Sequence, residues 1–245
     1  MKLEFLGRGG AFFVEEGNTS AYFIEDKTLF LIDCGESVFS KIVQLHLLEE
    51  NQIEAVVCFI THMHSDHTGS LSSLIYYCAY ALVNSPLCFM IVCHNRVTKE
   101  LKQMLAAQGC AGFYSLLPVE VLSNHFRSFN EVRFIRTAHQ LDYPASCIEF
   151  TTDNGKVFYS GDTRDLELIR SYVQNAKDIE RIYLETTLLD YPGNAHLPLR
   201  GLNEIIPKNL RRKVYLMHFN NADCIAKAKE LGFRVVRCVR KTNHG

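Results

Sequence analysis

The sequence predicts a single α/β domain spanning residues 1–245, and three observations support this fold class. Short apolar runs rich in β-branched residues, such as Ile53–Ile60, are typical of buried strands. Segments with helical periodicity lie between these runs, for example over residues 38–50. The composition, with 47% hydrophobic and 22% charged residues among 245, is that of a globular enzyme that buries a full core.

Strands and turns open the chain, and helices then alternate with strands. Strands are expected over 2–6, 19–25 and 28–33, and their short connections predict a sheet of neighbouring antiparallel strands. The following elements are a helix over 38–50, a strand over 53–60, a helix over 70–83, a strand over 87–93 and a helix over 95–108. Asn95 is the expected N-cap of the last helix and Gly109 its stop. This order is βαβ alternation.

The second half begins with a less regular stretch over residues 110–130 and then returns to alternation. The expected strands are 131–137, 146–152, 156–160, 181–185, 213–217 and 233–239, and the expected helices are 165–175, 199–206 and 222–231. Asn154-Gly155 is the strongest signal for a short hairpin in the chain. Neither a repeat nor a low-complexity linker is present, so no domain boundary is expected.

Charge and composition restrict the partners. A net charge of −1 provides no general attraction to nucleic acid or to an anionic membrane. Residues 71–93 are uncharged over a length that can span a bilayer, but Asn84-Ser85-Pro86 interrupts them, so we expect a helix and a strand and no membrane partner. The N-terminus enters strand-like alternation at once, which predicts a cytoplasmic protein without a secretory signal. The nine cysteines form no C-x-x-C pair, which is typical of reduced thiols.

A dense group of metal-binding side chains follows the strand at 53–60. His62 and His64 are two residues apart and can point the same way, whereas Asp66 and His67 lie one turn further and can face a second point. Imidazole and carboxylate suit zinc, manganese or iron, and no cysteine is present to close a structural zinc site. The pattern therefore predicts an open, catalytic site for two metal ions. The alternative is a polar loop with accidental histidines, which the density of the motif disfavours.

Further polar residues occupy predicted strand ends. Asp33 can be a turn former, an N-cap or an acid that supports the metal-binding loop. His139 and His218 follow strands, and Asp162 follows the predicted hairpin within Gly161-Asp162-Thr163. Each of the last three, taken alone, is better explained as an ordinary polar residue at the end of a strand or in a turn.

Taken together and in order, these segments resemble the metallo-β-lactamase superfamily over nearly the whole chain. The resemblance implies a four-layer αββα sandwich, in which two mixed sheets face each other with helices outside and a dinuclear site lies at one rim. It implies that one metal ion is held by His62, His64 and His139. It implies that the other is held by Asp66, His67 and His218, with Asp162 bridging the two. Zinc is the expected ion, and manganese is the alternative.

Glu185 and His196 narrow the resemblance to the phosphodiesterase branch, which includes the tRNA 3′-processing endonuclease. In that branch a glutamate supports a histidine that stabilises or protonates the leaving oxygen. Asp66 is the candidate general base in addition to its metal role. Two metal ions roughly 3.5 to 4 Å apart suit phosphodiester hydrolysis, because they activate a shared water and neutralise phosphate oxygens. The alternative for His196 is an exposed loop histidine.

The chain departs from the tRNA enzyme, which carries a long RNA-gripping arm. Only residues 140–161 separate His139 from Asp162, which leaves no room for such an arm, and the near-neutral charge also disfavours a large RNA. A basic cluster over residues 208–213 is interpreted as a solvated face. The compact chain resembles the anti-Pycsar cyclic-nucleotide phosphodiesterases of phages and their bacterial relatives. That resemblance implies hydrolysis of 3′,5′-cyclic mononucleotides to linear nucleoside monophosphates, by a homodimer that disarms cyclic-nucleotide immune signalling.

Three other functions stay open at this stage. The first is a tRNA 3′-processing endoribonuclease that grips RNA without an arm. The second is a thioester or lactone hydrolase of the same fold, which would not require the pair Glu185 and His196. The third is a catalytically silent nucleotide-binding module, which the full set of candidate ligands disfavours.

Overall fold

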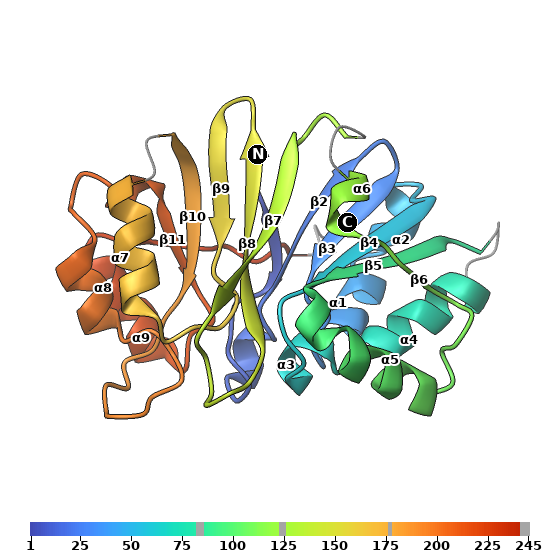
Figure 1. Ribbon diagram of the computed structural model, residues 1–245, viewed down its shortest axis with the longest axis horizontal. Coiled ribbons are helices and arrows are strands. Elements are labelled where there is room, and N and C mark those ends of the chain that lie inside the picture. The colour runs from blue at the N-terminus through green and yellow to red at the C-terminus, as the bar shows by residue number, and fades with distance from the viewer. Residues whose placement is uncertain (82–85, 123–125, 176–177, 241–245) are drawn as a thin grey trace, which may run out of the picture.

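The computed structural model describes residues 1–81, 86–122, 126–175 and 178–240. Two six-stranded sheets face each other, and helices cover the outer face of each sheet (Figure 1). The layers therefore run helix, sheet, sheet, helix. This arrangement confirms the predicted four-layer αββα sandwich with two mixed sheets.

The first sheet is built by the first half of the chain. Its strands, in spatial order, are β1 (Glu4–Gly7), β2 (Ser20–Glu25), β3 (Thr28–Ile32), β4 (Ala55–Ile60), β5 (Cys88–Cys93) and β6 (Ser115–Leu116). As predicted, β1 to β3 pair antiparallel, whereas β3 to β6 pair parallel. The helices on its side are α1 (Val38–Gln44), α2 (Leu47–Glu50), α4 (Leu71–Tyr76) and α5 (Thr98–Ala107), and the short α3 (Ser65–Thr68) lies at the lower end in Figure 1.

The second sheet follows the same plan. Its strands, in spatial order, are β12 (Arg234–Val235), β11 (Val214–Met217), β10 (Ile179–Glu185), β9 (Gly155–Tyr159), β8 (Ala145–Thr152) and β7 (Glu131–Thr137). β7 to β9 pair antiparallel and β9 to β12 pair parallel, and the predicted Asn154-Gly155 hairpin joins β8 to β9. The remaining helices are α6 (Val119–Leu122), α7 (Leu166–Asn175), α8 (Leu199–Ile205) and α9 (Ala222–Glu230).

Aromatic side chains fill the space between the two sheets. Phe23 stacks on Phe30 with ring centroids 4.6 Å apart, and Phe129 meets Phe30 edge-on at 5.8 Å. Side chains of β3 alternate: Phe30 points to this inner layer, and Leu31 packs under the helices. Both faces of β3 are therefore buried, which explains its unbroken apolar sequence.

Several predicted boundaries are wrong, each for a local reason. The helix expected over 38–50 is two helices, because His46 adopts a left-handed φ of 49° between them. The helix expected over 70–83 is α4 followed by a π-helical turn, η2 (Tyr77–Ala81). The end of that prediction, together with Asn84 and Ser85, lies outside the described residues.

The cap and the last strand also differ from expectation. The N-cap position of α5 is Val97, which makes no side-chain cap, so Asn95 is not the cap. Asn95 instead begins the 3₁₀ turn η3 (Asn95–Val97), which is capped by His94, whose Nδ1 accepts a hydrogen bond from the Arg96 amide. The strand expected over 233–239 is reduced to β12 and an isolated bridge between Cys238 and Phe5. The remaining 3₁₀ turns are η1 (Val14–Glu16) and η4 (Arg211–Lys213).

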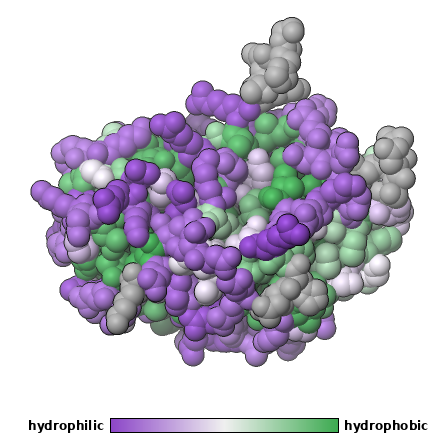
Figure 2. All heavy atoms as spheres, turned by 90° about the horizontal axis from the view of Figure 1, so that it is seen from above, coloured by the Kyte–Doolittle hydropathy of each residue, from purple (hydrophilic) through white to green (hydrophobic). Residues whose placement is uncertain are grey.

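Among the described residues, no helix is both long enough and apolar enough to cross a membrane. The end of the sandwich opposite α3 is mostly hydrophilic, with hydrophobic side chains in patches between the polar ones (Figure 2). The predicted solvated basic face is partly wrong. Arg211 is buried, and its guanidinium donates to the carbonyls of Asn203, Ile206 and Leu231, so it caps α8 and α9.

The topology brings the predicted strand-end residues to one rim. β3 and β4 are parallel and end just before Asp33 and His62. β9, β10 and β11 are also parallel and end before Asp162, at Glu185 and before His218. Because the ends of parallel strands meet at one edge, each sheet presents its polar residues at the same rim of the sandwich.

Candidate metal and catalytic site

The first cluster consists of three histidines. His62 Nε2 lies 3.1 Å from His64 Nδ1, which in turn lies 3.2 Å from His139 Nε2. His62 and His139 are buried, and burial lowers the pKa of all three imidazoles, that of His139 to about 4. They are therefore neutral at physiological pH, which is the form of imidazole that binds a metal ion.

The second cluster contains two carboxylates and two imidazoles, all buried. Asp66 Oδ2 lies 3.4 Å from His67 Nε2 and 3.2 Å from His218 Nε2. Burial lowers the pKa of His218, but the charge of Asp162 and the hydrogen bond that His218 donates to Asp66 outweigh this effect and raise that pKa overall. Burial opposes charge on Asp162 as well, but its neighbouring imidazoles hold its pKa well below the ordinary value. This cluster therefore contains ionised carboxylates, which the first cluster lacks.

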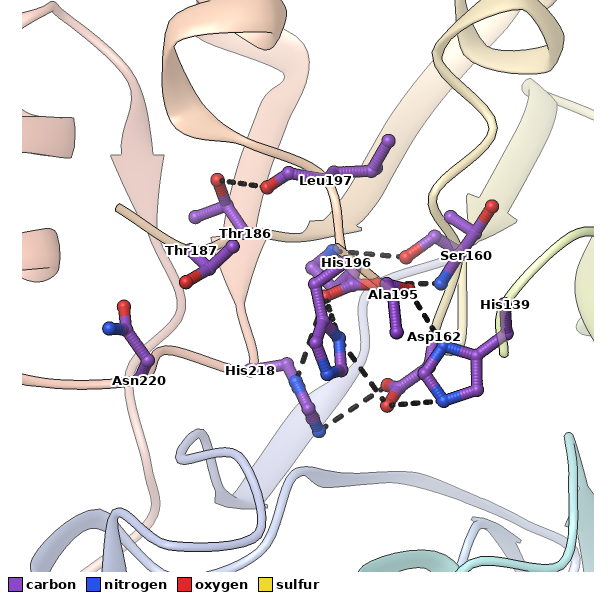
Figure 3. Close-up of polar contacts among 12 residues, drawn as sticks. His139, Ser160, Asp162, Thr186, Thr187, Ala195, His196, Leu197, His218 and Asn220 are labelled. Carbon is purple, nitrogen blue, oxygen red and sulfur yellow. Dashed lines mark hydrogen bonds and ion pairs between the residues drawn. The ribbon is translucent and has the colours of Figure 1, made fainter. Parts of the chain in front are cut away.

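Asp162 faces both clusters. Its Oδ1 lies 3.3 Å from both His67 Nε2 and His218 Nε2. Its Oδ2 lies 3.9 Å from His62 Nε2 and 3.8 Å from His139 Nε2. Figure 3 shows this carboxylate between His139 and His218. One carboxylate thus offers an oxygen to each of two ligand groups.

The donor atoms fit divalent metal ions. His67 Nε2 and Asp162 Oδ1 are buried and have no hydrogen-bond partner among the described residues, although they lie 3.3 Å apart. Tetrahedral zinc with bonds near 2.1 Å separates its ligand atoms by roughly 3.4 Å. The separations of 3.1 to 3.4 Å within each cluster match that spacing. Nitrogen and oxygen donors of this kind suit zinc, manganese and iron alike.

Hydrogen bonds on the far side of the imidazoles fix their orientation. Asp33 Oδ2 accepts from His67 Nδ1 at 2.8 Å, and the same carboxylate accepts from the backbone amide and the hydroxyl of Thr61, each at 2.8 Å. His139 Nδ1 donates to the carbonyl of Ala195 at 2.8 Å. These bonds leave Nε2 of both imidazoles free to face a metal ion. The expected support of the metal-binding loop by Asp33 is confirmed.

The sequence interpretation missed three contributors. Thr61 anchors Asp33, and its position beside the histidine motif was a usable signal. Tyr143 stacks on the ring of His64 with centroids 4.4 Å apart, and an isolated tyrosine in a loop gives no such signal. Ala195 acts only through its carbonyl, which leaves no trace in side-chain chemistry.

Strained backbone accompanies the site. Asp33 and His218 adopt left-handed φ angles of 60° and 55°, which are uncommon for residues other than glycine. Gly161 has φ of 54°, and a Cβ there would lie 2.9 Å from the Ser146 carbonyl oxygen and 3.1 Å from Thr61 Cβ. A glycine is therefore required where the chain turns to present Asp162.

Glu185 and His196 form a hydrogen-bonded pair beside the clusters. Glu185 is fully buried, and its Oε2 accepts from His196 Nδ1 at 2.8 Å while Oε1 accepts from the Thr163 amide. His196 Nδ1 lies 3.7 Å from Asp162 Oδ2, and about a third (32%) of its side chain is exposed. Burial lowers the pKa of His196, but Glu185 and then Asp162 together have a larger opposite effect, and the pKa is raised to about 9. The pair thus provides a partly exposed imidazolium next to the ligand clusters.

The structure brings every predicted site residue together. Three groups with ligand atoms within 4.8 Å of one another can each hold a metal ion: His62, His64 and His139; Asp66, His67, Asp162 and His218; Asp162, Glu185, His196 and His218. The third group overlaps the second. Its member Glu185 already accepts a hydrogen bond from His196, so the first two groups are the stronger candidates for metal ions.

Comparisons with known proteins indicate one family and one fold. A family model described as "Anti-Pycsar protein Apyc1" matches residues 1–239. A protein of that name from Paenibacillus harenae is 25% identical to the chain over 234 residues, with 90% of both chains covered. Another from Bacillus phage 010DV004 is 25% identical over an alignment of 256 residues, with 95% of both chains covered. The metallo-β-lactamase fold protein YhfI from Bacillus subtilis superposes with a TM-score of 0.71 at 17% identity, covering 98% of this chain and 95% of its own.

Proposed function

The chain belongs to the Anti-Pycsar protein Apyc1 family, and on that premise we propose that it hydrolyses 3′,5′-cyclic mononucleotides to linear nucleoside monophosphates. It is a metal-dependent hydrolase of the metallo-β-lactamase superfamily. The finer assignment, to a cyclic-nucleotide phosphodiesterase that removes an immune signal, is our proposal. The observation that carries it is the buried Glu185 bonded to His196 at 2.8 Å beside the ligand clusters.

We propose that His62, His64 and His139 hold one divalent ion and that Asp66, His67 and His218 hold the other, with Asp162 shared. Zinc is our proposed ion, with manganese as the alternative. When bound, two such ions lower the pKa of a water and neutralise phosphate oxygens during in-line attack. A compact phosphodiester is the substrate class that uses both effects.

The side chains of the protein then move the protons. Asp66 accepts a proton from the attacking water, since one of its oxygens already lies at the second cluster. As the bond between phosphorus and O3′ breaks, His196 donates a proton to the leaving oxygen from the nitrogen that does not face Glu185. Glu185 holds Nδ1 of that ring and its charge stabilises the imidazolium. The leaving hydroxyl and the neutral imidazole complete the proton balance.

A turnover panel tests the proposal. The metal-loaded protein is incubated with cyclic AMP, GMP, CMP and UMP and, in parallel, with a 3′-extended tRNA precursor, and products are separated by chromatography. We expect linear monophosphates from the cyclic nucleotides and an intact tRNA. Cleavage of the tRNA with the cyclic nucleotides untouched would identify a tRNA-processing enzyme instead. Tight nucleotide binding without turnover of either substrate would identify a silent binding module.

We also propose that the protein acts in the cytoplasm as a homodimer. Support comes from large apolar side chains exposed on loops near the candidate site: Phe12 is 97% exposed, Leu141 81% and Tyr191 55%. Leu141 lies two residues after His139, and Gly10, close to Phe12, lies against the ring of His218. Light scattering after size exclusion tests this proposal. A monomer at every concentration would contradict it.

A further inference from the structure

A cavity lies away from the candidate catalytic site, beside the first halves of β10 and β11. It has a volume of about 560 Å³ and is bordered by β1, β10, β11 and β12. Arg181 on β10 lines it, four residues before Glu185, which corresponds to roughly 13 Å along a strand. The first residues of the chain also line it, and Figure 1 places the N-terminus in the upper part of the molecule, away from α3. A ligand in this cavity would therefore be separate from one at the metal clusters.

Positive charge dominates the walls of this cavity. The cationic residues that line it are Lys2, Arg8, Arg181, Lys229, Arg234 and Arg237, and Glu4 is the one carboxylate among the lining residues. Such a concentration is unexpected in a chain whose net charge is −1. A concave surface with one sign of charge concentrates ligands of the opposite sign.

Tyr215 fixes two of the arginines in place. Its hydroxyl accepts hydrogen bonds from Arg181 Nη1 at 2.9 Å and from Arg234 Nη1 at 2.7 Å, and both guanidinium groups lie within 5.6 Å of its ring centre. Two cations thus share one neutral oxygen. They repel each other, and an anion bound between them would relieve that repulsion.

Nearby carboxylates neutralise only part of the charge. Glu4 pairs with Lys2 at 2.6 Å, and Glu16 pairs with Arg8 at 2.6 Å. Glu180 lies 3.6 Å from Arg181 Nε but also binds the N-terminal amino group. Within the described parts of the chain, no carboxylate lies within 4.0 Å of the three remaining lining cations, Lys229, Arg234 and Arg237.

We propose that this cavity binds the phosphate of a small phosphomonoester of nucleotide size. A phosphomonoester carries about −1.5 to −2 charges at pH 7 on one compact group, and paired guanidinium groups bind it with several hydrogen bonds. The volume exceeds that of a free phosphate and lies in the range of small-molecule pockets. Leu3, Phe5 and Val235 provide an apolar wall for the rest of the ligand. The inference does not depend on the substrate proposed for the metal site.

Isothermal titration of the metal-loaded protein with 5′-AMP, inorganic phosphate and adenosine tests the proposal. The test variant is Arg181→Ala/Arg234→Ala, and the matched control is Arg170→Ala/Arg200→Ala, which removes two arginines that do not line the cavity. Binding at the metal site is common to all three proteins, so a difference between them reports the cavity. We expect the test variant to lose one AMP-binding event or to bind at least tenfold more weakly, and the control to match wild type.

Two further variants keep the test valid if that variant fails to fold, as judged by its circular dichroism and metal content. Tyr215→Phe removes only the oxygen that joins the arginines, and Lys229→Ala/Arg237→Ala removes rim cations; both should weaken AMP binding. Competition between inorganic phosphate and AMP would support the proposal, because it would show that the cavity recognises the phosphate group. Identical AMP titrations in wild type and all cavity variants would overturn it. So would adenosine binding as tight as AMP, or binding of a single-stranded oligonucleotide with no binding of AMP or phosphate.

Discussion

The two halves of the molecule are built alike but contribute to the site differently. Each half forms a sheet with antiparallel strands followed by parallel ones. The first half presents its candidate metal ligands at residues 62–67, on the loop after β4 and the short helix α3 that follows it. The second half presents single residues after β7, β9 and β11, and the Glu185–His196 pair between them. The site therefore combines ligands that are close together in the sequence of the first half with ligands that are far apart in the sequence of the second.

The dispersed half has the greater control over the proposed site. Asp162 faces both clusters, whereas each candidate ligand among residues 62–67 belongs to one of them. Substitutions in the second half should therefore have effects on both metal ions or on the chemistry itself. The predictions below test that asymmetry, beginning with the largest expected effect.

Asp162→Ala should have the largest effect. It removes an oxygen from each cluster, so both ions are lost or misplaced and cyclic-nucleotide turnover should fall by about a thousandfold or more. Steady-state kinetics with cyclic AMP measures this loss. The control is Asp165→Asn in the same loop, which keeps the side-chain oxygen that caps α7 and should leave turnover near wild type. A loss below tenfold in Asp162→Ala would refute the shared role of Asp162.

His196→Ala should have the next largest effect, without loss of metal. Removing a general acid typically costs about 10²- to 10⁴-fold in rate. Metal content should stay at wild-type level, because His196 lies outside the two proposed ligand sets. Turnover of cyclic AMP and metal analysis on the same sample separate the two effects. Unchanged turnover with full metal content would show that the histidine has no part in catalysis.

Glu185→Gln should have a smaller effect with a distinct pH signature. The carboxylate raises the pKa of His196, so its neutral replacement should lower that pKa. A general acid works only while it is protonated. The alkaline limb of the pH–rate profile should therefore lie at lower pH in the variant than in wild type. The rate at neutral pH should fall by about 10- to 100-fold. An alkaline limb at the wild-type position would mean that Glu185 does not set the charge of His196.

Glu149→Gln should change stability and not chemistry. Glu149 on β8 is almost fully buried. Burial raises its pKa, but the hydrogen bonds from Arg133 and Lys156 outweigh that effect, so its folded pKa lies below the ordinary value. Its stabilisation is therefore present above about pH 4.3 and lost as pH falls through the folded pKa.

Urea unfolding measures this effect. At pH 7 the variant should lose about 1 kcal/mol, a modest value because Arg133 is half exposed. The loss should shrink as pH falls below 4. Glu131→Gln, an exposed acid 4.0 Å from the same arginine, is the matched control and should change stability little. An equal loss for Glu149→Gln at pH 7 and pH 3.5 would contradict the assigned charge state.

The compact half of the site was the easier part to predict. The spacing of His62, His64, Asp66 and His67 indicates metal binding without any alignment, because four metal-binding side chains within six residues have few other uses. The residues of the second half carry no such local signal. His139, Asp162 and His218 became informative only through the order that they share with a known superfamily, and the structure then placed them within contact distance.

Element boundaries and supporting contacts were harder to predict for physical reasons. Propensity does not reveal that His46 turns left-handed and divides a helix. It also does not reveal that Arg211 is buried and donates to helix carbonyls. The basic run over residues 208–213 was therefore predicted to be fully solvated. Contacts such as that of Tyr143 on His64 depend on loops that meet only in the folded chain.

Metal content per chain tests most directly the claim that both halves build one two-metal site. Inductively coupled plasma mass spectrometry of wild type, His64→Ala and His218→Ala provides the count after dialysis against zinc-free buffer. We expect two ions in wild type and one in each variant, because each substitution removes a ligand from a different cluster. A wild-type protein that holds a single ion, or variants that both keep two, would contradict the account.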